Sequence, residues 1–364
     1  MDTITQGLLG AATAQLGFRQ RIGRDATWVA AGAAVVPDLD VLLPPLLRLV
    51  GVAGDDMAFL RIHRGLSHSL LFAPVLSLLI ALLWWRLRRR WEANGDAPAR
   101  RAHAPPFALL YACVLVAVFT HPLLDWCTSY GTRLLEPLTD ARYAIDAAPI
   151  IDLIYTPILI LTLVGCRIAR RGGRRATRQT LVIGWLGFAA SVGYLGAGRL
   201  LHDRAVRKGL ARLGGEKVVR ADAYPAIGSI LLWRVVIETD SAWHAVRVHH
   251  LSTRPPRAWR ARTVAKQTPG PWVERARRLP QYATYAWFAA GRVRAEYERV
   301  DGMHVVRFHD MRYAAATDGV ESLWPLAAAF NARGQLLWVH RERPMRERGA
   351  GEVIGAIWGD LWSP

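Results

Sequence analysis

Three short motifs in the first half of the sequence combine histidine and aspartate, the residue types that bind transition metals through nitrogen and oxygen. They are Val36-Pro37-Asp38-Leu39-Asp40, His63-Arg64-Gly65-Leu66-Ser67-His68 and His121-Pro122-Leu123-Leu124-Asp125. Residues at positions i and i+4 share a helix face, and two Asp after a helix-breaking Pro can converge on one cation from a loop or bridge two. Neutral imidazole is the commonest nitrogen ligand. The predicted metal ligands are therefore Asp38, Asp40, His63, His68, His121 and Asp125.

Further polar residues suggest what such a site would do. Arg64 would suit an anionic substrate oxygen, such as that of a phosphate. Asp152 stands in an apolar run (Ile150 to Ile154) and needs a cation or a hydrogen-bond donor there. Whichever of Asp40, Asp125 and Asp152 is not a ligand would serve as general base. Our catalytic candidates are therefore Asp40, Arg64 and Asp152, whereas the competing structural interpretation is helix capping and His–Asp pairs that tie helices together.

The elements that must position these residues are apolar helices. Hydrophobic residues make up 52% of the 364 residues and charged residues 21%, a composition typical of membrane proteins. Four segments are long enough to cross a bilayer, namely Leu66–Trp85, Pro106–Trp126, Pro149–Cys166 and Thr180–Leu201. Two shorter Gly- and Ala-rich segments, Ile4–Phe18 and Ala26–Pro37, are short spans, re-entrant helices or a packed hairpin. The sequence leaves these three options open.

Arginine in the loops predicts the orientation. The formal net charge is +18, and a basic protein can bind nucleic acid. Here the basic residues adjoin the apolar runs, at Arg19–Arg24, Arg86–Arg90 with Arg100 and Arg101, and Arg167–Arg178, which favours cytoplasmic loops of a membrane protein and no nucleic-acid partner. With these loops inside, every His and Asp motif lies near the outer face.

Residues 202–364 form a second, extracytoplasmic domain in this interpretation, after a membrane domain of residues 1–201. Alternation of apolar and polar residues predicts a mainly antiparallel β fold. The expected strands are Leu231–Thr239, Trp243–Leu251, Tyr282–Phe288, Gly291–Val300, His304–Tyr313, Ser322–Phe330 and Gln335–His340. Asp301-Gly302 is a hairpin turn signal. The predicted fold class is an α-helical polytopic membrane domain followed by an antiparallel β domain.

Residues 1 to about 200 resemble a known family in the order and spacing of their motifs. The matching segments are MDTITQGLLGA, PDLD, HRGLSHS, HPLLDWCTSYGTRLLEP and IIDLIYTP. They are similar to the YdjM-like, inner-membrane-associated family of proposed metal-dependent hydrolases, which is distantly similar to the zinc-dependent phospholipase C and P1-nuclease group. The resemblance implies an inner-membrane location and a site of His and Asp on packed helices. The family often has His where this chain has Gln6, which would weaken or remove one metal position.

The function expected from these observations is metal-dependent hydrolysis at the outer membrane face. The cofactor would be one or more divalent ions, with zinc first and manganese or iron as alternatives. The bilayer is the expected partner, and a phosphoester or lipid-linked compound the expected substrate. One alternative is a non-enzymatic scaffold that presents the β domain and uses the polar cluster, or a structural metal, for stability. A transporter is a third hypothesis, which the apolar middles of the spans disfavour.

Overall fold

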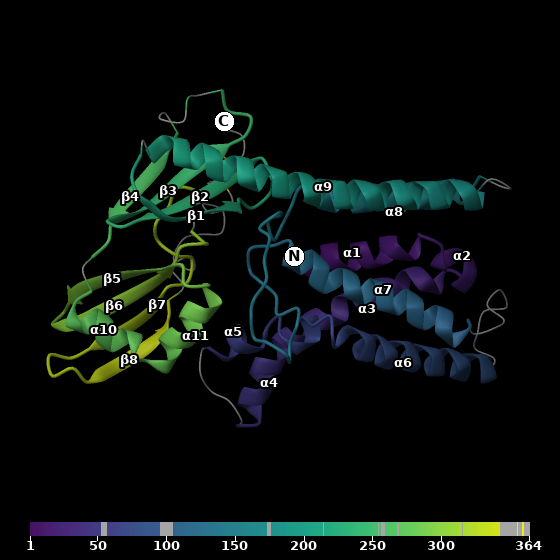
Figure 1. Ribbon diagram of the computed structural model, residues 1–364. Coiled ribbons are helices and arrows are strands. Elements are labelled where there is room, and N and C mark those ends of the chain that lie inside the picture. Colours follow the sequence, from purple (N-terminus) through teal and green to yellow (C-terminus); the bar gives the residue numbers. More distant parts are fainter. Residues whose placement is uncertain are drawn as a thin grey trace. The chain divides into compact units, whose positions relative to one another are not determined.

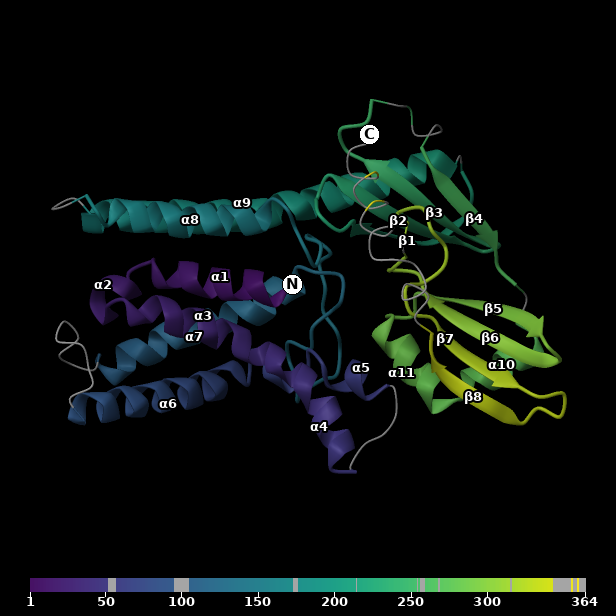
Figure 2. The ribbon, with the colours of Figure 1, turned by 180° about the vertical axis from the view of Figure 1, so that it is seen from behind.

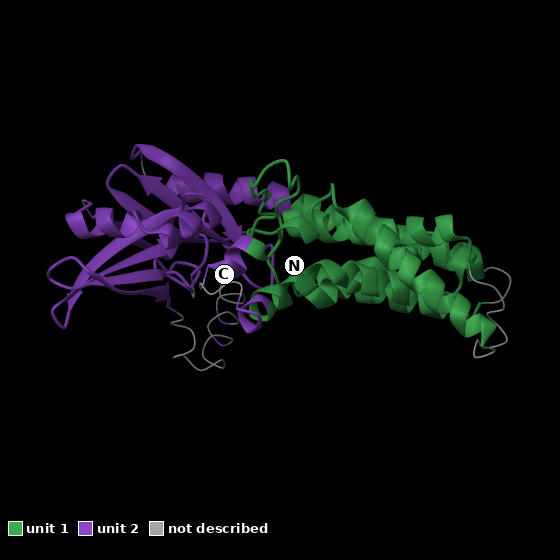
Figure 3. Cartoon of the chain, turned by 90° about the horizontal axis from the view of Figure 1, so that it is seen from below, with its two compact units in different colours: residues 1–46, 62–197 green, residues 47–61, 198–364 purple. Residues whose placement is uncertain are grey.

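The protein divides into a helical unit and a β-rich unit. The computed structural model describes residues 1–51, 57–94, 105–172, 176–213, 215–253, 255, 259–267, 269–314, 316–342, 355 and 359. Residues 1–46 and 62–197 form the helical unit, and residues 47–61 and 198–364 the other (Figure 3). The predicted fold class is confirmed, since apolar helices precede two four-stranded antiparallel sheets. Arg100, Arg101, Arg174 and Arg175 of the predicted basic loops lie outside the described residues.

Helices account for nearly all regular structure before residue 214. In chain order they are α1 (Thr3–Ala14), α2 (Phe18–Ile22), α3 (Asp25–Val35), the 3₁₀ helix η1 (Val36–Leu42), α4 (Leu43–Leu49), α5 (Ala58–Ile62), the 3₁₀ helix η2 (Leu66–His68), α6 (Ala73–Ala93), α7 (Phe107–Trp126), α8 (Tyr155–Ala169) and α9 (Ala176–Leu213). In the helical unit, α2 and the C-terminal ends of α6 and α8 lie at one end, and the N-terminus lies at the other (Figures 1 and 2).

Three helical segments are long and apolar enough to cross a membrane. Within the described residues these are Asp25–Leu49, Phe107–Trp126 and Ala176–Leu210, and a fourth is possible if Ala58–His68 and Ala73–Ala93, bent by 74°, count as one span. The predicted start of the first long span at Leu66 is therefore wrong, because Ser69 ends η2 in extended backbone before α6 begins. The predicted domain boundary at residue 201 falls inside α9, which continues to Leu213.

The predicted span Pro149–Cys166 is also wrong in its bounds. Its helix, α8, begins only at Tyr155 and has 15 residues, fewer than the roughly 20 that a span requires. The carboxylate of Asp152 accepts hydrogen bonds from the backbone nitrogens of Ile154 and Tyr155, both at 2.8 Å. A side chain that binds these free N–H groups starts the helix there. Beyond it, α8 packs on α9, where Gly187 faces Thr162.

The two short Gly- and Ala-rich segments form a packed hairpin. Helices α1 and α3 approach so closely that a Cβ atom at Gly10 would overlap the carbonyl oxygen of Ala30 and the Cβ of Ala34. Small residues permit such close contact between helices. Helix α3 also packs on α7, with Ala33 and Ala34 in one core cluster with Cys113 and Ala117. This packing fixes the C-terminal end of α3 beside α7.

The β-rich unit contains two sheets with simple sequential strand order. The first comprises β1 (Val218–Pro225), β2 (Leu232–Thr239), β3 (Ala242–His249) and β4 (Ala261–Ala265), and the second β5 (Val293–Val300), β6 (Met303–Asp310), β7 (Leu326–Phe330) and β8 (Leu336–Arg341). The hairpin at Asp301-Gly302 is confirmed, with φ of 50° and 79°, the positive values that a tight hairpin turn requires.

One predicted strand in this unit is wrong. Tyr282–Phe288 belongs to helix α11 (Pro280–Phe288), which follows helix α10 (Pro271–Arg277). Proline in the first turn favours a helix start, and the buried Tyr285 and Phe288 are spaced by three, as one helix face requires. Strands β1 and β4 were not predicted, because exposed residues occupy much of both.

Candidate metal site

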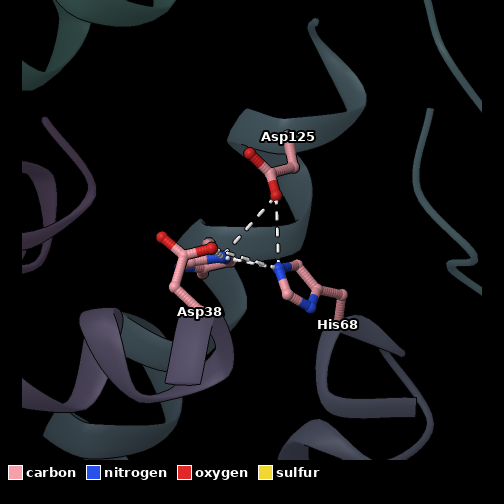
Figure 4. Close-up of side chains that lie close together, drawn as sticks. Asp38, His68 and Asp125 are labelled. Carbon is pink, nitrogen blue, oxygen red and sulfur yellow. Dashed lines mark hydrogen bonds and ion pairs between the residues drawn. The ribbon is translucent and has the colours of Figure 1, made fainter. Parts of the chain in front are cut away.

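Four ionisable side chains from three elements converge in the helical unit, and Figure 4 labels Asp38, His68 and Asp125 among them. Asp38 lies on η1, His68 ends η2, and His121 and Asp125 share one face near the end of α7. One nitrogen or oxygen atom of each lies within 4.8 Å of the others. The side chains of His68, His121 and Asp125 are fully buried, while that of Asp38 is 11% exposed. This arrangement could hold a metal ion.

Hydrogen bonds determine which ring nitrogen of each histidine faces the cluster. Nδ1 of His121 lies 2.6 Å from the carbonyl oxygen of Ala34, which can only accept, so this nitrogen carries the proton. Nδ1 of His68 lies 2.9 Å from Oγ of Ser67, whose own proton goes to Asp40, so Nδ1 of His68 is also a donor. In their neutral forms both rings therefore direct an Nε2 lone pair into the cluster.

The resulting geometry fits a divalent ion. The two Nε2 atoms are 2.9 Å apart, so their lone pairs repel unless a proton or a metal ion lies between them. Oδ1 of Asp38 is 3.5 Å from Nε2 of His68 and 3.4 Å from Nε2 of His121, and Oδ2 of Asp125 is 3.4 Å and 3.6 Å from the same atoms. Donors 2.0–2.2 Å from a common ion are separated by about 2.8–3.6 Å in octahedral or tetrahedral arrangements. The residues present thus fit the ion that the sequence predicts.

A buried carboxylate oxygen of Asp125 is a further feature that suits a cation site. Oδ2 of Asp125 is buried and accepts no hydrogen bond within the part of the chain that the structure describes. Its nearest charge is Nε of Arg64, at 3.0 Å. A buried carboxylate oxygen without hydrogen bonds is costly unless a charge compensates it. The guanidinium of Arg64 supplies that charge here, and Oδ2 keeps a lone pair that could bind an ion.

Asp40 and His63, two of the six predicted ligands, form a pair beside the cluster. Oδ1 of Asp40 lies 2.8 Å from Nδ1 of His63, and Oδ2 accepts from the backbone nitrogen of Arg64 at 3.1 Å and from Ser67 at 2.8 Å. Asp40 thus organises the turn from His63 to His68, and Nδ1 of His68 lies 3.3 Å from it. Histidine ligands are commonly oriented by such carboxylates.

Arg64, a predicted catalytic residue, borders the cluster in an unusual conformation. Its φ of 60° is rare for a residue with a side chain, and the bond from its backbone nitrogen to Asp40 holds it there. Its guanidinium lies against Asp125, donates to Oγ1 of Thr128 at 2.9 Å and stacks on Tyr130 at 4.7 Å. This places a fixed positive charge next to the candidate metal ligands.

Asp152, the third catalytic candidate, has a different environment. Besides capping α8, it accepts the single hydroxyl proton of Tyr194, whose oxygen lies 2.9 Å from Oδ1 and 2.7 Å from Oδ2. Among the described residues, no hydrogen bond or ion pair joins it to the four clustered side chains. Donors therefore satisfy this buried carboxylate without a metal.

Several contacts to the cluster were not predicted. Thr3 donates to Oδ2 of Asp38 at 2.7 Å, and the amino nitrogen of Met1 pairs with Oδ1 of Asp125. Nε2 of Gln6 donates to the same oxygen at 3.0 Å, whereas its Oε1 is buried without a hydrogen bond in the described chain. The comparison of motifs drew attention to Gln6. The contact between the Ala34 carbonyl and His121 could not be predicted from the sequence, because every residue has a backbone carbonyl.

Comparison with known proteins identifies the family of the helical part of the chain. No curated protein and no solved structure matches the chain. The family model described as YdjM inner membrane protein matches residues 1–202 of the 364. The match covers more than half of the chain and includes every element that contributes to the cluster. The resemblance inferred from the motifs is confirmed, and the chain belongs to the YdjM inner membrane protein family.

Proposed function

We propose that this membrane protein is a metal-dependent hydrolase whose ion is held by Asp38, His68, His121 and Asp125. The observation that supports this most strongly is the approach of two buried Nε2 atoms to 2.9 Å while each Nδ1 donates elsewhere. A site of two imidazoles and two carboxylates suits zinc, and manganese or iron are alternatives. When bound, such an ion lowers the pKa of a water molecule and polarises the bond to be cleaved.

The residues beside the cluster suit acid–base chemistry and anion binding. The ring of His63 lies 5.7 Å from that of His68 between ring centres, and Asp40 fixes its orientation. A histidine oriented by a carboxylate is a common proton acceptor and donor. We assign this role to His63 and assign Asp40 as its positioning residue. Arg64 would bind an anionic oxygen of the substrate, and Asp152 has a helix-capping role in this proposal.

The expected substrate is a phosphoester or a lipid-linked compound, and the expected location of the site is the extracytoplasmic side. Basic residues gather at the opposite end of the helical unit, at Arg19–Arg24 and at Arg86–Arg90, and arginine-rich ends face the cytoplasm. The same orientation places residues 202–364, the proposed second domain, outside the cytoplasm.

The test is hydrolysis in reconstituted membranes. The purified chain in vesicles of phosphatidylethanolamine and phosphatidylglycerol is incubated with zinc, manganese or iron(II), and products are identified by mass spectrometry. We expect turnover that a chelator abolishes, that added metal restores, and that His121→Ala lacks. His340→Ala, on the exposed part of β8, is the matched control. Turnover unchanged by chelation or by His121→Ala would contradict the proposal.

A structural metal is the second candidate, and the ligand count favours it. Four protein donors are enough to fill a tetrahedral site, and closed sites of this kind stabilise folds without catalysis. In that case the chain would be a scaffold for the β-rich unit. The same vesicles distinguish the two: a scaffold loses thermal stability on chelation and shows no turnover with any of the three metals.

A further inference from the structure

An apolar groove runs along the surface of the α1–α3 hairpin. Its volume is about 520 Å³, within the range of roughly 300–1,000 Å³ that small-molecule sites occupy. None of the lining residues is charged; they are Thr3, Ile4, Gly7, Trp28, Ala31, Gly32, Val35, Val36 and Leu39. Trp28 and Ile4 are 78% and 73% exposed at its rim. A groove this apolar suits a hydrocarbon ligand.

One end of the groove adjoins the candidate metal site. Thr3, which lines the groove, donates its hydroxyl to Oδ2 of Asp38 at 2.7 Å. Leu39, another lining residue, stands between Asp38 and Asp40 in the chain. From there the groove follows α3 back to Trp28, eleven residues earlier, along one helix face. The groove therefore has a polar, ion-binding end and an apolar remainder.

This polarity matches an amphiphile. Part of the groove wall belongs to the candidate span Asp25–Leu49, so hydrocarbon chains are what surrounds it in a bilayer. We propose that the groove holds one acyl chain of a membrane phospholipid, whose phosphoester head group then lies at Asp38. The inference rests on the proposed function and specifies its substrate class. Cationic Arg64, beside the cluster, suits the negative charge of such a head group.

Gly32 offers a way to fill the groove without disturbing the fold. A Cβ atom there would meet nothing within 4 Å in the described chain, so Gly32→Trp places its ring in the groove. Gly193, on the candidate span of α9, is equally open. Gly193→Trp is therefore the matched control, because it adds the same side chain to a membrane helix away from the groove.

The experiment measures labelling by a photoactivatable lipid. Each protein is reconstituted in phosphatidylethanolamine and phosphatidylglycerol vesicles that contain a trace of phosphatidylglycerol with a diazirine in its acyl chain. Illumination is followed by tryptic digestion, which separates residues 25–48, with the groove, from residues 179–199, with Gly193. We expect residues 25–48 to be labelled in excess over residues 179–199, and Gly32→Trp to reduce that labelling about tenfold, as the loss of a buried apolar contact would. Gly193→Trp should leave it unchanged.

Equal labelling of both peptides, or labelling of residues 25–48 that Gly32→Trp does not reduce, would overturn the inference. A disulfide-linked dimer of Gly32→Cys would also overturn it, because a second copy would then occupy the groove. The labelling requires neither metal nor turnover, so its failure differs from failure of the hydrolase proposal. Specific labelling without hydrolysis would contradict only the proposal that the protein is a hydrolase. Hydrolysis without specific labelling would contradict only the proposal that the groove binds an acyl chain.

Discussion

The Nε2 atoms of His68 and His121 lie 2.9 Å apart, close enough to share one proton or to bind one metal ion together. The Nδ1 proton of His121 is bound by the carbonyl of Ala34, and that of His68 is directed to Ser67. Two buried lone pairs at this separation repel each other, and a metal ion bound by both nitrogens, or a proton shared between them, would offset that repulsion. The close pair explains why two carboxylates, from η1 and α7, approach the same point.

Asp40→Asn should weaken metal binding without abolishing it. The side chain of Asn has an NH₂ donor in place of one acceptor oxygen. This group would face either Nδ1 of His63 or the N–H of Arg64 and the hydroxyl of Ser67, where a donor meets another donor. Loss of such an orienting carboxylate typically lowers metal affinity about 10–100-fold. Calorimetric titration of the metal-free protein with zinc measures the change, with Asp301→Asn in the exposed β5–β6 turn as control. A loss as complete as that of His121→Ala would place Asp40 among the direct ligands instead.

Gly10→Ala should destabilise the helical unit, whereas Gly32→Ala should not. A methyl group at Gly10 overlaps Ala30 and Ala34, and overpacking of this kind costs about 1–3 kcal/mol. Ala34 also holds His121 through its carbonyl, so the displacement should reach the metal site. Thermal unfolding in detergent provides the comparison. Equal melting temperatures for the two variants would contradict the close packing of α1 on α3.

The β-rich unit should lose stability in acid partly through Glu296. A hydrogen bond from His309, at 3.2 Å, and the Arg294 contact at 2.6 Å lower the pKa of Glu296 to about 2. Because this pKa lies below its ordinary value of 4.5, the charged form stabilises the fold above about pH 4.5, and the contribution is lost as the pH falls towards 2.

The Glu296→Gln variant tests this linkage. Its deficit in melting temperature relative to the wild type should be largest near neutral pH and should shrink as the pH falls through about 4.5 towards 2. Glu274→Gln, which changes an exposed i,i+3 pair with Arg277, is the control. A deficit that is constant with pH would show that Glu296 acts through packing and not through its charge.

The orientation should place the C-terminal end outside the cytoplasm. Arg19–Arg24 and Arg86–Arg90 lie at the end of the helical unit opposite the cluster, and the arginine-rich end should face inward. Alkaline phosphatase, which is active only outside the cytoplasm, should be active when fused after Pro364, a position beyond the described residues. Activity of a cytoplasmic reporter at that position would reverse the orientation and move the proposed site to the inner face.

Part of the cluster could be predicted from the sequence because residue spacing constrains it. His121 and Asp125, four residues apart in an apolar helix, can only share a face, and they do. The roles of Asp38 and Asp40 could not be separated in this way. Asp38 reaches the cluster and Asp40 binds the turn from His63 to Ser67 because of how η1 packs, a tertiary property that no local pattern records.

The wrong predictions of secondary structure have similar causes. Tyr282–Phe288 is apolar on too many sides for its period to distinguish helix from strand, and packing of Tyr285 and Phe288 decides for the helix. The start of α8 was missed because Asp152 was interpreted as a site residue, although an aspartate before an apolar run is also a helix-start signal.

The metal content of the purified protein tests the central claim most directly. The chain is purified in detergent, supplied with zinc, manganese or iron(II), freed of unbound ion and measured by inductively coupled plasma mass spectrometry. We expect the wild type and His340→Ala to retain one ion per chain, and His68→Ala and His121→Ala to retain at least about tenfold less. A wild type that binds none of the three metals, or histidine variants that bind as much as the wild type, would contradict the account.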